Sequence, residues 1–109
     1  MTGSWVSQGE RALWQRRAAA ELAAILGACQ DLPVIAWTVG PAGSVLAGRV
    51  SGLAPAAQVR EVFGAWRLAL ALEDYCEHRS GAGIVWLCAA SRRHQVKVRL
   101  TANVFEDEG

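Results

Sequence analysis

The sequence predicts an α+β domain whose elements follow the order helix, hairpin, helix, hairpin, written αββαββ. Two long stretches place apolar residues three and four positions apart, which is typical of amphipathic helices. Each stretch is followed by two apolar runs with a turn-like break between them, which indicates a β-hairpin. We therefore expect a two-layer sandwich, in which a four-stranded antiparallel sheet carries two helices on one face.

A chain of 109 residues is long enough for one hydrophobic core and too short for two. Residues 1–109 are therefore expected to form a single domain. Residues 1–7 precede the first apolar stripe and are expected to form a flexible arm. Residues 106–109 read Glu-Asp-Glu-Gly, and this acidic tail is expected to fray.

The first helix is predicted from residue 10 to residue 29. Ser7 and Glu10 have the spacing of a capping box, which marks a helix start. The stripe that would face the core consists of Trp14, Ala18, Leu22, Ile25, Leu26 and Cys29. Pro33 ends this stretch because the residue before a proline is disfavoured in the helical conformation.

Residues 34–39 and 44–50 predict the first hairpin. Both runs alternate with the two-residue period of a strand, and the Gly-Pro-Ala-Gly sequence at 40–43 is rich in turn formers. Both faces of this hairpin are largely apolar, whereas a strand with one wet side alternates between apolar and polar residues.

The second helix is predicted over residues 56–75. Its apolar stripe contains Val59, Val62, Phe63, Trp66, Ala69 and Leu70. The polar, glycine-rich residues 73–83 predict the end of this helix and an exposed loop. Residues 84–90 and 95–104 predict the second hairpin. The common layout of the two halves of the chain favours an internal repeat.

The composition narrows the classes of function. The net charge is +1, so the chain as a whole has no field that would recruit nucleic acid or an anionic membrane. The three cysteines lack paired metal-ligand spacing, and an odd number argues against a disulfide framework. No apolar run approaches the length of a membrane span, and the first residues lack a signal-peptide pattern. We expect a cytoplasmic protein with no membrane partner and no cofactor.

A non-enzymatic protein-interaction module, homodimeric and accessory or regulatory in role, is the first functional hypothesis. Hydrophobic residues make up 52% of the chain. The outer side of the first hairpin is largely apolar, and helices on the opposite face of the sheet would leave it exposed to water. A second copy about a twofold axis would supply it, and the first helix wrapping round is the alternative. The predicted interface residues are Trp14, Val34, Ala36, Trp37, Leu46, Val50 and Trp86.

Nucleic-acid binding through a basic β-hairpin is the second hypothesis. The densest cluster of basic residues lies at and after the turn of the last hairpin, and arginines on a β-ribbon can anchor on phosphates. The predicted contact residues are Arg49, Arg92, Arg93, Lys97 and Arg99. The alternative role of these charges is to protect a sheet edge against aggregation.

A small-molecule-binding domain is the third hypothesis, centred on Cys76, His78 and the loop at 81–83. Cys76 and His78 are a nucleophile and a base close in sequence. Adjacency supplies no orienting group and no oxyanion hole, so no catalytic residue is assigned and no enzyme activity is expected. The histidines and cysteines are scattered, so no metal site is predicted.

Three segments resemble a group of small actinobacterial proteins of uncharacterised function. They are residues 32–49, with Leu32-Pro33, Trp37-Thr38-Val39-Gly40 and Leu46-Ala47-Gly48-Arg49, residues 62–70, VFGAWRLAL, and residues 98–108, VRLTANVFEDE. The resemblance covers most of the chain from Leu22 onwards. It implies an actinobacterial origin and the αββαββ layout, and it implies no activity. The N-terminal segment with Trp5 and Trp14 departs from the shorter members of that group.

Overall fold

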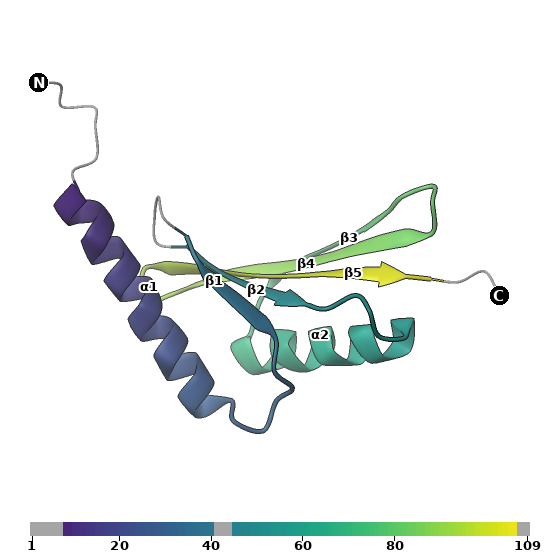
Figure 1. Cartoon of the computed structure of the whole chain (residues 1–109), viewed down its shortest axis with the longest axis horizontal. Coiled ribbons are helices and arrows are strands. Elements are labelled where there is room, and N and C mark those ends of the chain that lie inside the picture. Colours follow the sequence, from purple (N-terminus) through teal and green to yellow (C-terminus); the bar gives the residue numbers. More distant parts are fainter. Residues whose placement is uncertain (1–7, 41–44, 107–109) are drawn as a thin grey trace, which may run out of the picture.

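The computed structural model describes residues 8–40 and 45–106, which form two helices and five strands (Figure 1). The helices are α1 (Gln8–Ala28) and α2 (Ala56–Leu70). The strands are β1 (Ala36–Val39), β2 (Val45–Val50), β3 (Asp74–Arg79), β4 (Ile84–Arg93) and β5 (Val96–Phe105). The predicted α+β class is confirmed, although the element order is αββαβββ. Neither described helix is long and apolar enough to cross a membrane.

The strands form one mixed sheet in the order β1-β2-β5-β4-β3. β1 and β2 pair antiparallel, as do β4 and β5, so both predicted hairpins are present. β2 and β5 run parallel at the centre, where Leu46 lies opposite Val98. The prediction of four wholly antiparallel strands was therefore wrong. Apolar alternation identifies a strand and its two faces, but it carries no information on the direction of a distant neighbour.

β3 is the strand that the sequence did not predict. Its sequence, Asp-Tyr-Cys-Glu-His-Arg, contains no aliphatic residue, so its polarity predicted a loop. All of its residues are exposed, because β3 is an edge strand that the helices do not cover. It pairs with β4 from Asp74–Ala90 to Arg79–Val85. Backbone pairing with a neighbour, rather than burial of side chains, therefore defines this element.

α2 ends at Leu70, five residues before the predicted boundary. Ala71 has a left-handed backbone with φ of 53°, and its N–H donates to the carbonyl oxygen of Leu68. The N–H of Leu72 donates to the carbonyl oxygen of Arg67 at 3.1 Å. A left-handed cap of this kind ends a helix, and at a residue other than glycine it costs roughly 1–2 kcal/mol. Burial of Leu72 in the core offsets that cost.

Both helices lie on the same face of the sheet, as predicted, with α1 near the turn between β4 and β5 and α2 along β5 (Figure 1). Alternate residues of three strands are buried beneath them. These are Leu46 and Val50 of β2, Val85, Leu87 and Ala89 of β4, and Val96, Val98, Leu100, Ala102 and Val104 of β5. The helices contribute Ala18, Ile25, Val59, Phe63, Trp66 and Leu70. One core therefore fills the space between a helical layer and a single sheet face.

Trp66 connects α2 to the β1 end of this core. Its indole Nε1 donates a hydrogen bond of 2.8 Å to the carbonyl oxygen of Pro33. Its ring meets the ring of Trp37 edge to face, with centroids 5.6 Å apart. Trp37 in turn covers Gly48, where an added Cβ would stand 2.9 Å from the indole. The glycine therefore leaves the space into which the Trp37 ring packs.

Two further predictions are corrected by the fold. The second half of the chain is αβββ rather than αββ, so the halves do not repeat one layout. The acidic tail does not fray from residue 106, because Glu106 accepts hydrogen bonds from Arg60 at 2.6 Å and from Arg79 at 2.8 Å. The predicted arm at 1–7, the capping residue Ser7, turn residues 41–43 and the tail residues 107–109 lie outside the described residues.

Candidate binding face of the sheet

The sheet face opposite the helices has no cover in the part of the chain that the structure describes. Alternate residues of every strand point to it, and none of them is buried. We name this surface the open face. Its residues are Ala36, Thr38, Val45, Ala47, Arg49, Asp74, Cys76, His78, Ile84, Trp86, Cys88, Ala90, Arg92, Lys97, Arg99, Thr101, Asn103 and Phe105.

Positive charge gathers at one end of the open face. Lys97 and Arg92 are opposed next to the turn between β4 and β5, Arg99 follows in the next row, and Arg49 follows in the row after that. Asp74 is the one carboxylate among the open-face residues. None of the four cations makes an ion pair with another described residue. Their charges are therefore available to an anionic partner.

Two exposed aromatic rings stand at the other end of the open face. Trp86 is 47% exposed and Phe105 is 54% exposed. Asn103 lies directly opposite Trp86 and adds an amide beside the indole. From Lys97 to Phe105 the face extends about 26 Å, at roughly 3.3 Å per residue of a strand. A long, shallow surface thus grades from cationic to aromatic.

Four of the five predicted nucleic-acid contact residues share this face, and Arg93 does not. Arg93 points to the helix face, where its Nε donates to Glu21 at 3.1 Å and its guanidinium also contacts the carbonyl oxygen of Leu70 at 3.4 Å. This corrects the prediction, because successive residues of a strand point to opposite faces. Arg49 joins the others because the parallel pairing of β2 with β5 places Ala47 opposite Arg99 and Arg49 opposite Thr101.

Glu21 is the one charged side chain that is buried among the described residues. Its Oε2 accepts from Arg93, and its Oε1 lies 2.8 Å from Nδ1 of His94. His94 and Gln95 form the two-residue turn between β4 and β5, with φ of 50° and 69°. Positive φ at both residues is the type I′ geometry that matches the twist of a hairpin. Glu21 therefore ties α1 to the turn at the cationic end of the sheet.

The Glu21 contacts predict how stability depends on pH. Burial tends to raise the pKa of Glu21, but the hydrogen bonds and charges of His94 and Arg93 outweigh burial and lower the pKa below its usual value of 4.5. The ionised carboxylate therefore stabilises the fold above about pH 4.5, and this contribution is lost as the pH falls through the lowered folded-state pKa.

We expect the free energy of unfolding, measured by urea titration at several pH values, to fall less steeply below pH 4.5 in Glu21→Gln than in the wild type. Glu61→Gln is the control, because Glu61 is exposed on α2 and makes no ion pair with another described residue. The control should keep the wild-type slope. A Glu21→Gln protein with the wild-type slope would contradict the prediction.

On the helix face, in contrast to the open face, the charges of β3 are paired. Glu77 accepts from the hydroxyl of Tyr75 at 2.9 Å and lies 3.5 Å from Arg60. The hydrogen bond to Glu106 raises the pKa of Arg60, and those from Arg79 and Arg60 lower the pKa of Glu106. These contacts join β3 to α2 and to the end of β5. These ion pairs stabilise the fold. The four unpaired cations lie on the open face, on the other side of the sheet.

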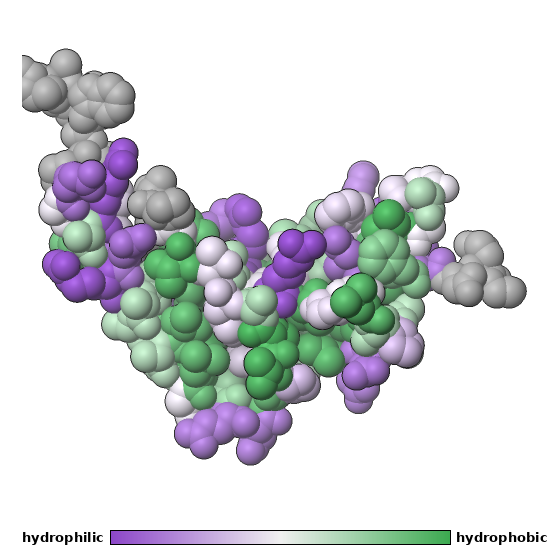
Figure 2. All heavy atoms as spheres, viewed as in Figure 1, coloured by the Kyte–Doolittle hydropathy of each residue, from purple (hydrophilic) through white to green (hydrophobic). Residues whose placement is uncertain are grey.

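The structure separates the seven predicted interface residues. Leu46 and Val50 are buried in the core of their own chain and are not accessible to a partner, which corrects their assignment. Trp37 packs on Trp66, and Trp14 lies half-buried on α1. Val34, before β1, is 98% exposed. Figure 2 shows apolar surface over β1 and the second half of α1. The remaining two, Ala36 and Trp86, lie on the open face, on strands that are not neighbours.

The prediction that both faces of the first hairpin are largely apolar therefore holds for the helix face and only in part for the open face. Its helix face holds the large side chains, and these are covered by α1 and α2. Its open face carries Ala36, Thr38, Val45, Ala47 and Arg49. These residues are small or polar apart from Val45, so the need for a second apolar cover, on which the homodimer prediction rests, is weaker than the sequence indicates.

The residues of the predicted small-molecule site do not form a pocket with catalytic geometry. Cys76 and His78 lie two residues apart on exposed β3, and no hydrogen bond joins them in the described structure. The loop at 81–83 is a tight hairpin turn in which Gly83 has φ of 79° and its carbonyl oxygen accepts from the N–H of Glu106. Within residues 8–40 and 45–106, no three His, Cys, Asp or Glu side chains are placed to hold a metal ion.

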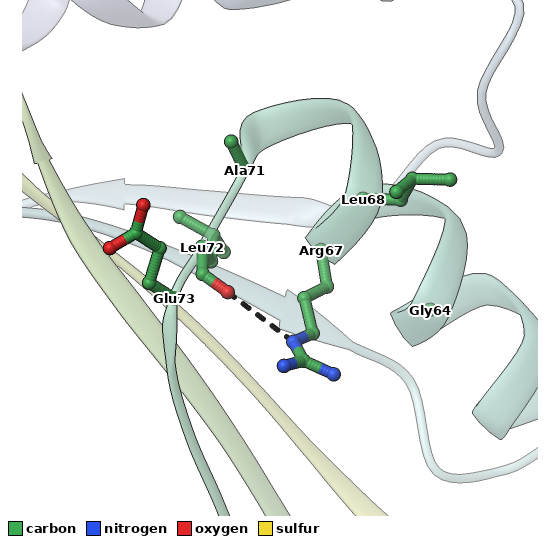
Figure 3. A pocket seen from close by; sticks show the side chains of 6 residues that line it. All are labelled: Gly64, Arg67, Leu68, Ala71, Leu72 and Glu73. Atoms are coloured by element: carbon green, nitrogen blue, oxygen red, sulfur yellow. Dashed lines mark hydrogen bonds between the residues drawn. The ribbon is translucent and has the colours of Figure 1, made fainter.

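A hollow of about 670 Å³ lies at the end of α2 (Figure 3). It is lined by Gly64, Arg67, Leu68, Ala71, Leu72 and Glu73. The Arg67 side chain donates to the carbonyl oxygen of Leu72 at 3.3 Å and stacks over the ring of Tyr75 at 4.2 Å. Its guanidinium is therefore engaged in holding the segment that follows the helix. The lining residues include no serine, cysteine or histidine.

Two residues of the site were missed by sequence reasoning, and each had a signal. Phe105 lies at the end of the last strand, where its alternation with Val104 placed it on the polar face. Glu21 lies three residues after Ala18 and four before Ile25, within the apolar stripe of the first helix. A carboxylate in such a stripe requires a partner, because burial of an unpaired charge is costly.

No family model and no curated protein matches this chain. The resemblance to small actinobacterial proteins therefore stays a prediction. The functional conclusion rests on the open face and on its chemistry.

Proposed function

We propose that this protein binds single-stranded nucleic acid on the open face of its sheet and carries out no catalysis. The observation that carries the proposal is that four unpaired cations and two exposed aromatic rings share one uncovered face. Cations attract phosphates by a term that does not depend on sequence. Aromatic rings stack on unpaired bases, each stack contributing about 1–3 kcal/mol.

The order of these groups along the strands supports a single strand rather than a duplex. Trp86 and Phe105 stand at one end of the surface and can reach only bases that are not already stacked in a helix. Arg92, Lys97 and Arg99 stand at the other end, along the direction in which an extended backbone would run. Asn103 and the hydroxyl of Thr101 between them can donate and accept hydrogen bonds.

The homodimer expected from the sequence stays a prediction, and the open face is a poor surface for it. In a face-to-face pair, a twofold axis along the strands would place the cations of one copy over those of the other. A twofold axis across the strands would place them over the exposed aromatic rings, and Asp74 is the one open-face carboxylate that could compensate either arrangement. Juxtaposed like charges cost several kcal/mol. The same charges favour an anionic ligand.

The test is binding of a fluorescent oligonucleotide of about twelve nucleotides, single-stranded or as a duplex, over a range of salt concentrations. The logarithm of the affinity should fall with the logarithm of salt, with a slope of about −2 to −3 for three or four phosphate contacts. The double variant Lys97→Ala with Arg99→Ala should lower the affinity at low salt by more than about tenfold and reduce this slope by about 1.4. Trp86→Ala should weaken binding by about 5-fold to 150-fold while leaving the slope unchanged.

The matched control is Arg16→Ala with Arg17→Ala, which removes two exposed arginines from α1, away from the open face. It should bind as the wild type does. Three results would overturn the proposal: no binding at low salt, an equal loss in the control, or a preference for duplex that Trp86→Ala leaves intact. A stable dimer in light scattering that Arg99→Ala strengthens would show instead that a second copy occupies the face.

A further inference from the structure

Two of the three cysteines lie directly opposite each other on the open face, midway along the edge strand β3 and its neighbour β4. Cys76 of β3 and Cys88 of β4 are register partners in an antiparallel pair. Opposed residues of such a pair point to the same face, and their Cα atoms lie about 4.5 or 5.5 Å apart. Both separations fall within the range of about 4.4–6.8 Å that a disulfide spans. The sequence, in which twelve positions separate the two residues, gives no sign of this pairing.

We propose that Cys76 and Cys88 form a dithiol site that reacts reversibly with small zwitterionic disulfides such as those of a peptide thiol. The inference does not rest on nucleic-acid binding, although both concern the same face. Both cysteines are free thiols, with Cys76 exposed and Cys88 half-exposed, so a small reagent reaches them without unfolding. Cys29, the third cysteine, is at the end of α1 and is not a register partner of either.

The surroundings of the two thiols carry charges of both signs. A shallow hollow of about 540 Å³ is lined by both cysteines, by the cations Lys97 and Arg99, and by the carboxylates of Glu73 and Asp74. The two cations make no ion pair with another described residue. Lys97 and Arg99 are placed to attract the carboxylates of a small peptide disulfide, and Glu73 and Asp74 are placed to attract its ammonium groups.

The reaction balances as two successive thiol–disulfide exchanges. The thiolate of Cys76 attacks one sulfur of the small disulfide, forms a mixed disulfide and releases one small thiolate. The thiolate of Cys88 then attacks the sulfur of Cys76, forms the Cys76–Cys88 bond and releases the second small thiolate. The two released thiolates take up the two protons that the cysteines lose. The cysteines are oxidised, the small disulfide is reduced, and an excess of small thiol reverses both steps.

The probe is oxidised glutathione, added to the reduced full chain at about pH 8, followed by acid quenching, alkylation with N-ethylmaleimide and mass spectrometry. We expect a product two hydrogen atoms lighter than the reduced chain, with Cys29 alkylated and Cys76 and Cys88 protected. Dithiothreitol should restore alkylation of both. The double variant Lys97→Ala with Arg99→Ala should form this product about tenfold more slowly, because it lacks the attracting charges.

Variants of the cysteines distinguish the possible products. Cys29→Ala should give the same intramolecular bond, whereas Cys88→Ala should stop at the glutathione adduct of Cys76. The proposal is overturned if the wild type accumulates only that adduct, if Cys76 crosslinks two chains instead, or if all three cysteines remain open to alkylation.

Discussion

Replacing Trp66 by alanine is expected to lower the free energy of unfolding by about 3–5 kcal/mol, the largest effect of any single change considered. Truncation of a buried tryptophan loses the transfer free energy of its ring and leaves a cavity that the core fills only in part. Trp66 is 2% exposed, and its ring also supports Trp37, which covers Gly48. Since single domains are stable by about 5–15 kcal/mol, the variant should be severely destabilised in urea titrations.

Trp66→Phe separates the parts of this effect and keeps the prediction testable if Trp66→Ala does not fold. Phenylalanine retains an aromatic ring in the core, but it cannot donate the hydrogen bond that the indole makes to Pro33. We expect a loss of about 1–2 kcal/mol, from one hydrogen bond and a small change in packing. If Trp66→Ala were no less stable than Trp66→Phe, the ring would not be what joins α2 to the β1 end of the core.

Replacing Arg93 by alanine is expected to cost about 2–3 kcal/mol of unfolding free energy. The change leaves the buried carboxylate of Glu21 with His94 as its remaining partner in the cluster. Loss of one member of a fully buried ion pair costs about 3–5 kcal/mol. We expect the smaller loss of about 2–3 kcal/mol for Arg93→Ala, because a third of the Arg93 side chain is exposed to solvent, which screens the ion pair.

Arg92→Ala is the matched control, since it removes the same side chain one residue earlier on the opposite face. Arg92 is exposed and makes no ion pair with another described residue, so the unfolding free energy should change by less than about 0.5 kcal/mol. Its nucleic-acid affinity should fall, because Arg92 is one of the open-face cations. Equal stability losses in the two variants would mean that the Glu21 cluster does not hold α1 to the hairpin turn.

The alternation of apolar residues predicted the inner face of the last strand correctly. The sequence pattern predicts that Val96, Val98, Leu100 and Ala102 face inward. All four are buried in β5, and the polar residues between them face outward. The same reasoning failed for β3, where no residue is buried and pairing with β4 alone makes the strand. Apolar residues alternate along a strand because one of its faces is buried. An edge strand with no buried side chain therefore has no alternation by which the sequence could predict it.

Some features of the candidate site could likewise be predicted from the sequence, and others could not. A cluster of basic residues near the last turn was visible in the sequence, but the sequence placed Arg92 and Arg93 in one group. A neighbour in sequence is on the opposite face of a strand, so Arg93 belongs to the core side and Arg92 to the open face. Arg49 joins the cluster only because β2 lies parallel to β5.

The sequence by itself determined the two helices, the two hairpins and the inward side of the last strand, because these follow from interactions between residues a few positions apart. Only the tertiary structure decided the order of the strands, the existence of β3, the uncovered face and the pairing of Cys76 with Cys88. Those features depend on which distant segments share backbone hydrogen bonds. Such pairing is chosen by the packing of the whole core, and no local periodicity encodes it.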